Sequence, residues 1–244
     1  MIAPPDGSHE VPIVMTATVI PQDKGPSAFT PEERLAEYEA ALTFYLKFAP
    51  VFFLENSGYP LEQHSAFRET SRLQVRRFRR SASPEKGKGH QEFEMLDTWL
   101  AAEKNPPPRW LKITGRYQFL NLESILEECR SPRCPSLLMD RLPRRQIART
   151  YSFCVASQYY RDKLQGLYQQ CDDRTGAWVE RVLFQRLRGQ PTSEVQLFKT
   201  QARIQAASGV TGLAFPTGRF QWGVKQMLRR ANRLLDRQYL WYSV

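Results

Sequence analysis

Residues that commonly bind zinc are scarce in this sequence. Its 244 residues include four cysteines and three histidines. No two cysteines show the Cys-x-x-Cys spacing of zinc sites and redox motifs, and the histidines lie far from them along the chain. The sequence therefore argues against a zinc protein. The cysteines fit four reduced thiols in a cytoplasmic protein.

Long hydrophobic runs are also missing. The longest, residues 48–54, is interrupted by Pro50 and is much shorter than the roughly 20 residues that cross a bilayer. The first ten residues contain no Lys or Arg, which predicts no secretory signal. Because 41% of the residues are hydrophobic and 12% aromatic, the chain can fill a core, which excludes global disorder.

Acidic and basic residues are unevenly distributed around a net charge of +10. Residues 1–64 hold three basic and nine acidic side chains, whereas residues 65–90 hold eight basic and two acidic ones. Residues 219–244 hold six basic and one acidic. This asymmetry predicts oriented electrostatics, with nucleic acid, an anionic membrane or phosphate-bearing small molecules as partners.

Strand-like and helix-like segments alternate over the first 140 residues. Alternation of this kind predicts an α/β fold, with a mostly parallel sheet flanked by helices. The apolar and β-branched runs predict strands at residues 11–19, 51–55, 73–78 and 110–114. The helical patterns lie at residues 31–48, 61–70 and 91–104.

The second half of the sequence has a different character, and we expect it to be largely helical. The helices are predicted at residues 147–167, 177–187, 195–207 and 221–239. We expect one α/β domain over residues 11–218, followed by a basic amphipathic helix over residues 219–244.

Polar residues follow the predicted strands, and ligands of parallel sheets bind outside the carboxyl ends of strands. The first strand ends with Thr16 and Thr18, and the second ends with Glu55, Asn56, Ser57 and Gly58. The acid and the amide can accept hydrogen bonds from a base or a ribose. The same residues also suit a plain turn.

A glycine-rich connection, Gly87-Lys88-Gly89-His90-Gln91-Glu92, leads into a predicted helix. Glycines let a backbone approach a phosphate, Lys88 can neutralise it, and a helix N-terminus adds partial positive charge. The connection lacks the phosphate-binding pattern GxxxxGK[ST] of nucleoside triphosphatases. A solvated loop is the alternative.

The segment Lys112-Ile113-Thr114-Gly115-Arg116-Tyr117 follows a strand directly. Arg116 offers a planar fork for a phosphate or carboxylate, and Gly115 lets a ligand or another backbone come close. Tyr117 adds a hydroxyl group. The alternative is an edge hairpin with solvated ends.

Two carboxylates are candidates for chemistry. Asp140 ends an apolar run and can bind a divalent cation, act as a base or cap a loop. Glu180 lies beside apolar residues on a predicted helix, where burial would raise its pKa and suit it to act as a general base. The alternative for Glu180 is a surface ion pair with Arg181.

The order of five motifs carries a resemblance to a known family. VMTATV, RLAEYEAALTFYL, FFLENSG, GKG and WLKITGRYQFLN resemble, in this order, bacterial glycosyltransferase-type proteins of capsule and lipopolysaccharide gene sets. Their fold is similar to that of the GT-A nucleotide-sugar transferases. The resemblance extends through ARTYSF and WVERVLF and covers about residues 11–190, and KITGRY is its most specific part.

The resemblance implies a site for a nucleotide-sugar donor. The nucleotide would lie near Thr16, Thr18 and residues 55–58, with Lys88 and Glu92 close by. Lys112 and Arg116 would face the phosphates or the sugar.

Asp140 or Glu180 would then supply the carboxylate that activates the acceptor, and Asp140 is also the candidate ligand for Mg²⁺ or Mn²⁺. GT-A enzymes usually carry an Asp-x-Asp metal motif where this chain has Gly115-Arg116-Tyr117, and the chain has no Asp-x-Asp. The resemblance therefore allows a metal-independent enzyme, in which fixed cations stabilise the leaving phosphate.

The basic C-terminal segment predicts a further partner. Its arginines alternate with Trp, Tyr, Leu and Met, a pattern that suits an anionic membrane surface, the alternative being a helix packed on the domain. The combined hypothesis is a cytoplasmic glycosyltransferase, peripheral at the inner face of the membrane, that acts on a glycan or lipid-linked acceptor. Two alternatives remain: a nucleic-acid-binding protein using residues 65–90, and a non-catalytic membrane-surface adaptor with the same fold.

Overall fold

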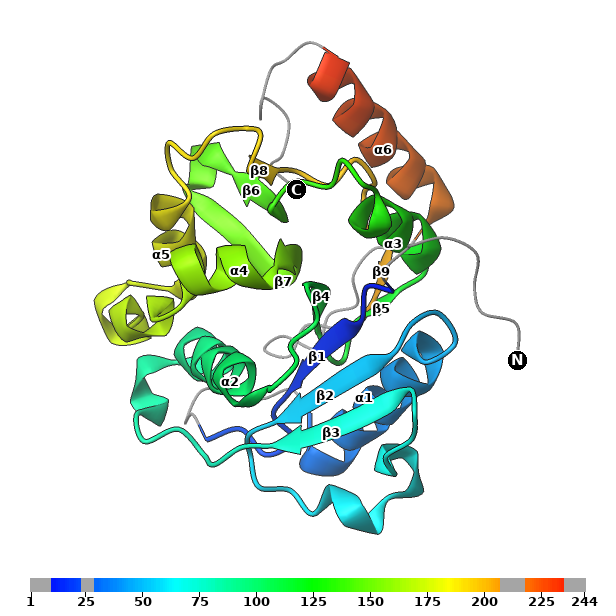
Figure 1. Cartoon of the computed structure of the whole chain (residues 1–244), viewed down its shortest axis with the longest axis vertical. Helices are drawn as coiled ribbons and strands as arrows, with labels where there is room; N and C mark the ends of the chain where they lie inside the picture. Colours follow the sequence, from blue (N-terminus) through cyan, green and yellow to red (C-terminus); the bar gives the residue numbers. More distant parts are fainter. Residues whose placement is uncertain (1–9, 23–28, 207–217, 235–244) are drawn as a thin grey trace.

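The computed structural model describes residues 10–22, 29–206 and 218–234. Its main feature is a seven-stranded sheet with the order β3-β2-β1-β4-β7-β6-β8, accompanied by the short pair β5-β9 (Figure 1). The strands are β1 (Ile13–Ala17), β2 (Val51–Glu55), β3 (Leu73–Arg77), β4 (Arg109–Thr114), β5 (Gln118–Phe119), β6 (Leu137–Leu142), β7 (Ile147–Ala156), β8 (Val195–Gln196) and β9 (Ile204–Gln205). The helices are α1 (Pro31–Tyr45), α2 (Lys88–Ala102), α3 (Leu122–Arg130), α4 (Ser157–Tyr159), α5 (Val179–Arg186) and α6 (Arg219–Leu234).

Strand β1 lies at the centre of the parallel part of the sheet. It pairs in parallel with β2 on one side and with β4 on the other, and β2 pairs in parallel with β3. Strand β7 runs antiparallel between β4 and β6, while β8 is parallel to β6. The protein therefore has the predicted α/β fold with a mostly parallel sheet. The chain first builds outward through β2 and β3 and then crosses back to β4, so the strand order reverses between β1 and β4.

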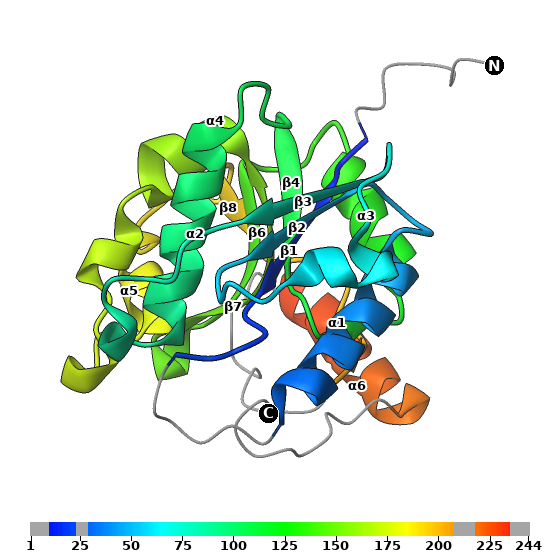
Figure 2. The same ribbon diagram turned by 90° about the horizontal axis from the view of Figure 1, so that it is seen from below.

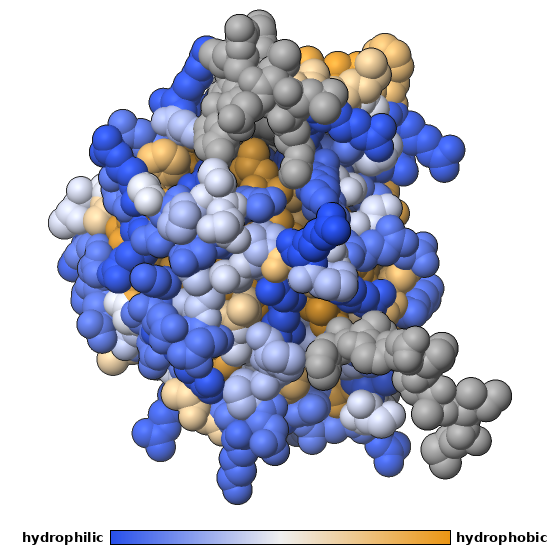
Figure 3. Space-filling model, turned by 45° about the horizontal axis from the view of Figure 1, so that its top comes forward, coloured by the Kyte–Doolittle hydropathy of each residue, from blue (hydrophilic) through white to orange (hydrophobic). Residues whose placement is uncertain are grey.

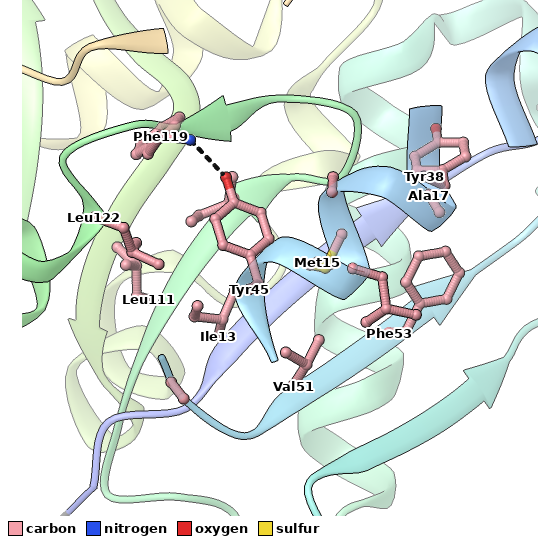
Figure 4. Packing of buried hydrophobic residues seen from close by; sticks show 14 of the residues in the cluster. Ile13, Met15, Ala17, Tyr38, Tyr45, Val51, Phe53, Leu111, Phe119 and Leu122 are labelled. Carbon is pink, nitrogen blue, oxygen red and sulfur yellow. Dashed lines mark hydrogen bonds between the residues drawn. The ribbon is translucent and has the colours of Figure 1, made fainter. Parts of the chain in front are cut away.

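Helices cover both faces of the sheet (Figure 2). Helices α2, α4 and α5 lie on one side, and α1, α3 and α6 lie on the other. Alternate side chains of β1 pack on opposite faces of the sheet, because successive side chains of a strand point in opposite directions. Ile13 and Met15 are fully buried in the core beneath α1, whereas Val14 is fully buried in the core on the other side, which contains Phe93 of α2. Figure 4 shows the α1 side of this packing.

Helix α1 begins as the sequence predicts. Thr30 is the N-cap: its side chain accepts from the backbone N–H of Glu33, and the Glu33 carboxylate accepts from the backbone N–H of Thr30. Pro31 occupies the first turn. This capping box satisfies two backbone donors at the helix start. At the other end, the buried Tyr45 hydroxyl accepts from the Phe119 N–H at 3.2 Å and ties the helix to β5 (Figure 4).

Three predicted helices need correction, and the one at residues 147–167 is wrong only in its first part. Residues 147–156 form strand β7, and helical structure begins only at Ser157. In the first part of this segment buried and partly exposed side chains alternate, which is the two-residue periodicity of a strand and not the 3.6-residue periodicity of a helix. Its Thr, Tyr, Phe and Val residues also favour strands. Residues 195–207 hold the short strands β8 and β9 in their described part, and residues 61–70 contain two short 3₁₀ turns. The second half is thus partly β.

Helix α6 confirms the predicted C-terminal helix from Arg219 to Leu234, and the predicted continuation to residue 239 lies outside the described residues. Nine of the ten residues on which the expectation of no secretory signal rests also lie outside them. Across the described ranges, no helix combines the length and the apolar character that crossing a membrane requires.

Candidate functional site

A cavity of about 560 Å³ lies at the carboxyl ends of β1 and β4. This is the point at which the strand order reverses, where open α/β sheets bind ligands. Its volume lies within the range of small-molecule sites. The walls come from the ends of both strands, from α1, from the first turns of α2, from Thr150 of β7 and from residues 173–180.

Eight of the predicted site residues line this one cavity. They come from segments up to 164 residues apart. They are Thr16, Thr18, Lys88, Glu92, Thr114, Arg116, Tyr117 and Glu180.

A buried ion pair lies beside the cavity, between α2 and β4. Lys112 Nζ is 2.6 Å from Glu92 Oε1, which also accepts a 2.5 Å hydrogen bond from the Thr16 hydroxyl. The ammonium group also donates to the Thr150 carbonyl at 2.7 Å and to the Thr114 hydroxyl at 3.2 Å. Lys112 is completely buried, and burial lowers its pKa although Glu92 opposes that shift. Lys112 therefore fixes Glu92 instead of lining the cavity, while the Glu92 side chain remains 20% exposed.

Among the candidate carboxylates, Glu180 is the one best placed for proton transfer. It lies in the first turn of α5, lines the cavity and is 3.5 Å from the Thr150 hydroxyl. Burial raises its pKa, and the nearby Glu92 and Asp173 raise it further, whereas Lys112 opposes them. A carboxylate of this kind suits proton transfer near neutral pH. Arg181, which the sequence offered as an ion-pair partner of Glu180, stacks on Trp178, with its guanidinium 4.4 Å from the ring centre.

Basic side chains surround the cavity from several elements. Arg116 is buried and forms a 2.5 Å ion pair with Glu37 of α1. Arg34, also of α1, donates to the Thr18 carbonyl at 2.6 and 3.0 Å. Lys88 is exposed at the start of α2, across from α1. Fixed cations at a cavity of this size suit a phosphate-bearing ligand.

The cavity-wall residues that sequence reasoning missed include Arg34, Tyr38, Thr150 and Trp178. Trp178 is 44% exposed and offers an aromatic surface on which a base or a sugar ring can stack. The available signal was a tryptophan two residues before the candidate acid Glu180. The other three lie on elements whose approach to the strand ends is decided by tertiary packing, so local patterns could not show them.

The glycines near the site make room for protein atoms. A Cβ at Gly115 would lie 2.8 Å from the Thr16 carbonyl oxygen and 2.9 Å from the Tyr38 ring. At Gly89 it would lie 2.2 Å from Val179, which lets the start of α2 meet α5. The sequence suggested that Gly115 lets either a ligand or another backbone come close. In the structure it is the backbone of Thr16 that comes close.

Residues 55–58 form a turn that supports the end of β1. Glu55 is fully buried, and its carboxylate accepts from the backbone N–H groups of Val19, Ser57 and Gly58. Asn56 accepts from the Thr18 hydroxyl at 2.7 Å. None of these four residues lines the cavity, so the turn alternative describes them.

Asp140 is occupied by an arginine from the C-terminal helix. Its two carboxylate oxygens accept from Arg229 of α6 at 2.8 and 2.7 Å, and Arg229 is 1% exposed. Asp140 does not line the cavity. Its chemistry here is that of a buried structural ion pair.

The candidate metal ligands of the described residues are dispersed or already bound by other protein groups. Within residues 10–22, 29–206 and 218–234, no three His, Cys, Asp or Glu side chains cluster in a way that could hold a metal ion. Lys112 and Thr16 occupy one oxygen of Glu92, and Arg229 occupies both oxygens of Asp140.

No family model and no curated protein matches this sequence. Solved structures with a similar fold include mouse xyloside xylosyltransferase 1, at 12% identity and a TM-score of 0.46 over 77% of this chain and 84% of that one. A 4-diphosphocytidyl-2C-methyl-D-erythritol synthase of Anaerococcus prevotii matches at 7% identity and 0.47, over 91% and 97%. A putative glucose-1-phosphate thymidylyltransferase of Bacillus anthracis matches at 12% and 0.47, over 90% and 95%.

Proposed function

We propose that the cavity binds a nucleotide-activated sugar and that the protein is a glycosyltransferase acting on a glycan or lipid-linked acceptor. One observation carries the proposal. The point where the strand order reverses holds a single cavity that brings together basic side chains and a carboxylate with a raised pKa. This combination suits a substrate with a phosphate leaving group and a hydroxyl group that must lose a proton.

The proposed reaction is a displacement at the anomeric carbon. The acceptor oxygen forms a bond to that carbon as the bond from the carbon to the donor phosphate oxygen breaks. The nucleotide leaves with the bonding electron pair, and the hydroxyl proton passes to Glu180. Burial supports this role, because it brings the pKa of the carboxyl closer to neutral pH.

The remaining residues bind and position in this proposal. Arg116 and Lys88 offset the charge that develops on the leaving phosphate. Lys112 acts indirectly, since it is buried and holds Glu92 in place. Trp178 provides a stacking surface for one of the rings. We propose that these fixed cations serve without a divalent metal.

The proposal is tested by binding of nucleotides to the full chain. UDP, GDP, dTDP and CMP, each with and without Mn²⁺, are added in a thermal-shift series. A ligand at about 100 times its Kd stabilises a protein by about 2.7 kcal/mol, so one nucleotide should raise the melting temperature by several degrees. The shift should not depend on Mn²⁺. The absence of a shift with every nucleotide would remove the proposed donor site.

The products distinguish glycosyl transfer from nucleotidyl transfer. Glycosyl transfer releases a nucleoside mono- or diphosphate from a nucleotide sugar. Nucleotidyl transfer consumes a nucleoside triphosphate and a sugar phosphate and releases pyrophosphate. Pyrophosphate release, with no nucleotide released from nucleotide sugars, would replace the proposal with nucleotidyl transfer.

The contacts of arginines in residues 65–90 argue against the alternative of a nucleic-acid-binding protein. Arg72, Arg76 and Arg77 each form an ion pair with a glutamate, and Arg80 donates to the Ser57 carbonyl. These acids offset the charge of the arginines, so we expect no gel shift of single- or double-stranded nucleic acid near physiological salt. A salt-dependent shift there would revive the alternative.

A further inference from the structure

Helix α6 is attached to the protein by its polar side. The Trp222 indole N–H donates to the Gln201 carbonyl at 2.7 Å, and the Gln226 side chain accepts from the Gln201 N–H at 2.6 Å. Arg229 binds Asp140 and also donates to the Phe198 carbonyl at 2.7 Å. These contacts place one polar stripe of the helix against the body of the protein.

The opposite side of α6 is apolar and exposed. Phe220 is 84% exposed, Met227 71%, Val224 44% and Leu228 43%. At 3.6 residues per turn these four positions fall within an arc of about 100°, opposite Trp222, Gln226 and Arg229. A surface helix normally turns its apolar stripe inward, so α6 is oriented in the reverse sense.

Positive charge borders the apolar stripe. Arg219 and Arg230 lie on one flank of it and Lys225 on the other, and α6 contains no Asp or Glu. In Figure 3, which turns the top of the molecule toward the viewer, apolar atoms lie beside strongly hydrophilic side chains at the upper right. An apolar stripe with basic flanks matches a helix that lies in the interface of an anionic bilayer, with its cations at the headgroups.

We propose that the exposed face of α6 docks on an anionic membrane surface. Charge favours this partner over a second copy of the chain, because two α6 helices packed together would bring like charges into contact. Arg229 has a clear role in this arrangement: its buried pair with Asp140 holds the helix with its apolar stripe outward. The proposal does not depend on the activity of the cavity.

The test is co-sedimentation of the full chain with lipid vesicles. Phosphatidylcholine vesicles are compared with vesicles in which phosphatidylglycerol replaces part of the lipid. We expect binding to the anionic vesicles that weakens with salt. Loss of two basic residues in K225Q/R230Q should weaken it roughly 25-fold, since each basic residue near the surface contributes about 1 kcal/mol. The control K104Q/K163Q removes two exposed charges outside α6 and should bind like the unaltered chain.

A second variant tests the apolar stripe. F220S/M227S removes two exposed side chains that make no core contact, so folding should be unaffected and vesicle binding should fall at least roughly 10-fold. Three results would overturn the proposal. They are no binding to either vesicle, equal binding to both vesicles, and a dimer in solution that the F220S/M227S change abolishes.

Discussion

Two buried ion pairs lie on different sides of the sheet and differ in what surrounds them. The pair of Lys112 and Glu92 faces α2, and its carboxylate reaches the cavity with 20% of its side chain exposed. The pair of Asp140 and Arg229 lies under α6, where Arg229 is almost completely enclosed. In the sequence the strands β4 and β6 look alike, since each is an apolar run that contains two charged residues. What differs is the distant helix that meets the charge, and whether its partner leaves room for a ligand.

The largest effect should come from breaking the enclosed pair. Arg229→Ala leaves the Asp140 carboxylate buried without its partner, and we expect a loss of about 3–5 kcal/mol of unfolding free energy, measured by urea denaturation. Nucleotide binding at the cavity, measured on the folded variant, should be unchanged.

The neighbouring Arg230 provides the control, because it is exposed on the same helix. Arg230→Ala should cost less than about 0.5 kcal/mol. The double variant D140N/R229Q should recover part of the stability lost in Arg229→Ala, because no buried charge is then left unpaired. Equal stability of the two single variants would show that the pair is not structural.

The next effect concerns the cavity. Glu180→Gln removes the proposed base, and we expect kcat to fall about 10²- to 10⁴-fold with the protein still folded. In the unaltered enzyme, kcat should decline on the acid side with an apparent pKa above the ordinary value of a glutamate. Exposed Glu123 on α3 serves as the control, and Glu123→Gln should be fully active. Unchanged turnover in Glu180→Gln would favour a non-catalytic adaptor.

A smaller effect should follow loss of one cation at the rim. Lys88→Ala should weaken nucleotide binding roughly 10-fold in calorimetric titration, because a charge-assisted contact to a phosphate contributes about 1.5 kcal/mol. Lys86 lies two residues earlier in the chain but does not line the cavity, and Lys86→Ala should bind normally. Equal weakening in both variants would indicate only a general electrostatic effect.

The parallel part of the fold could be predicted because its signals are local. Buried strands such as β1 and β2 are apolar runs in the sequence, and Thr30 and Glu33 predict the start of α1. Strand β7 was missed, because a half-buried segment with Arg149 and Tyr151 on partly exposed positions does not form a continuous apolar run. Its identity as a strand depends on pairing with β4 and β6, which no local pattern shows.

The site was predictable to the extent that strand order is predictable. The ends of β1 and β4 meet at the cavity as expected. The ends of β2 and β6 carry equally suggestive residues, Glu55 and Asp140, yet other protein groups occupy both carboxylates. Trp178 joins the site only because α5 begins there. Partners that come from far along the chain decide which of several similar strand ends stays open.

The smallest predicted effect is the dependence of stability on pH at the cavity. The pKa of Glu180 is raised in the folded protein, mainly by burial. Its contribution to stability is therefore complete below the unfolded-state pKa, and is lost as the pH rises through the folded-state pKa. Glu180→Gln should accordingly melt at a slightly higher temperature than the unaltered chain at pH 8, and the difference should shrink toward pH 4. Glu123→Gln should show no such trend, because its side chain is exposed. A difference in melting temperature that is constant from pH 4 to pH 8 would mean that the pKa of Glu180 is the same in the folded and unfolded states, against the prediction. A difference that grows with pH, together with lost turnover, would mean that the protein keeps a carboxylate there at the expense of stability because the reaction requires it.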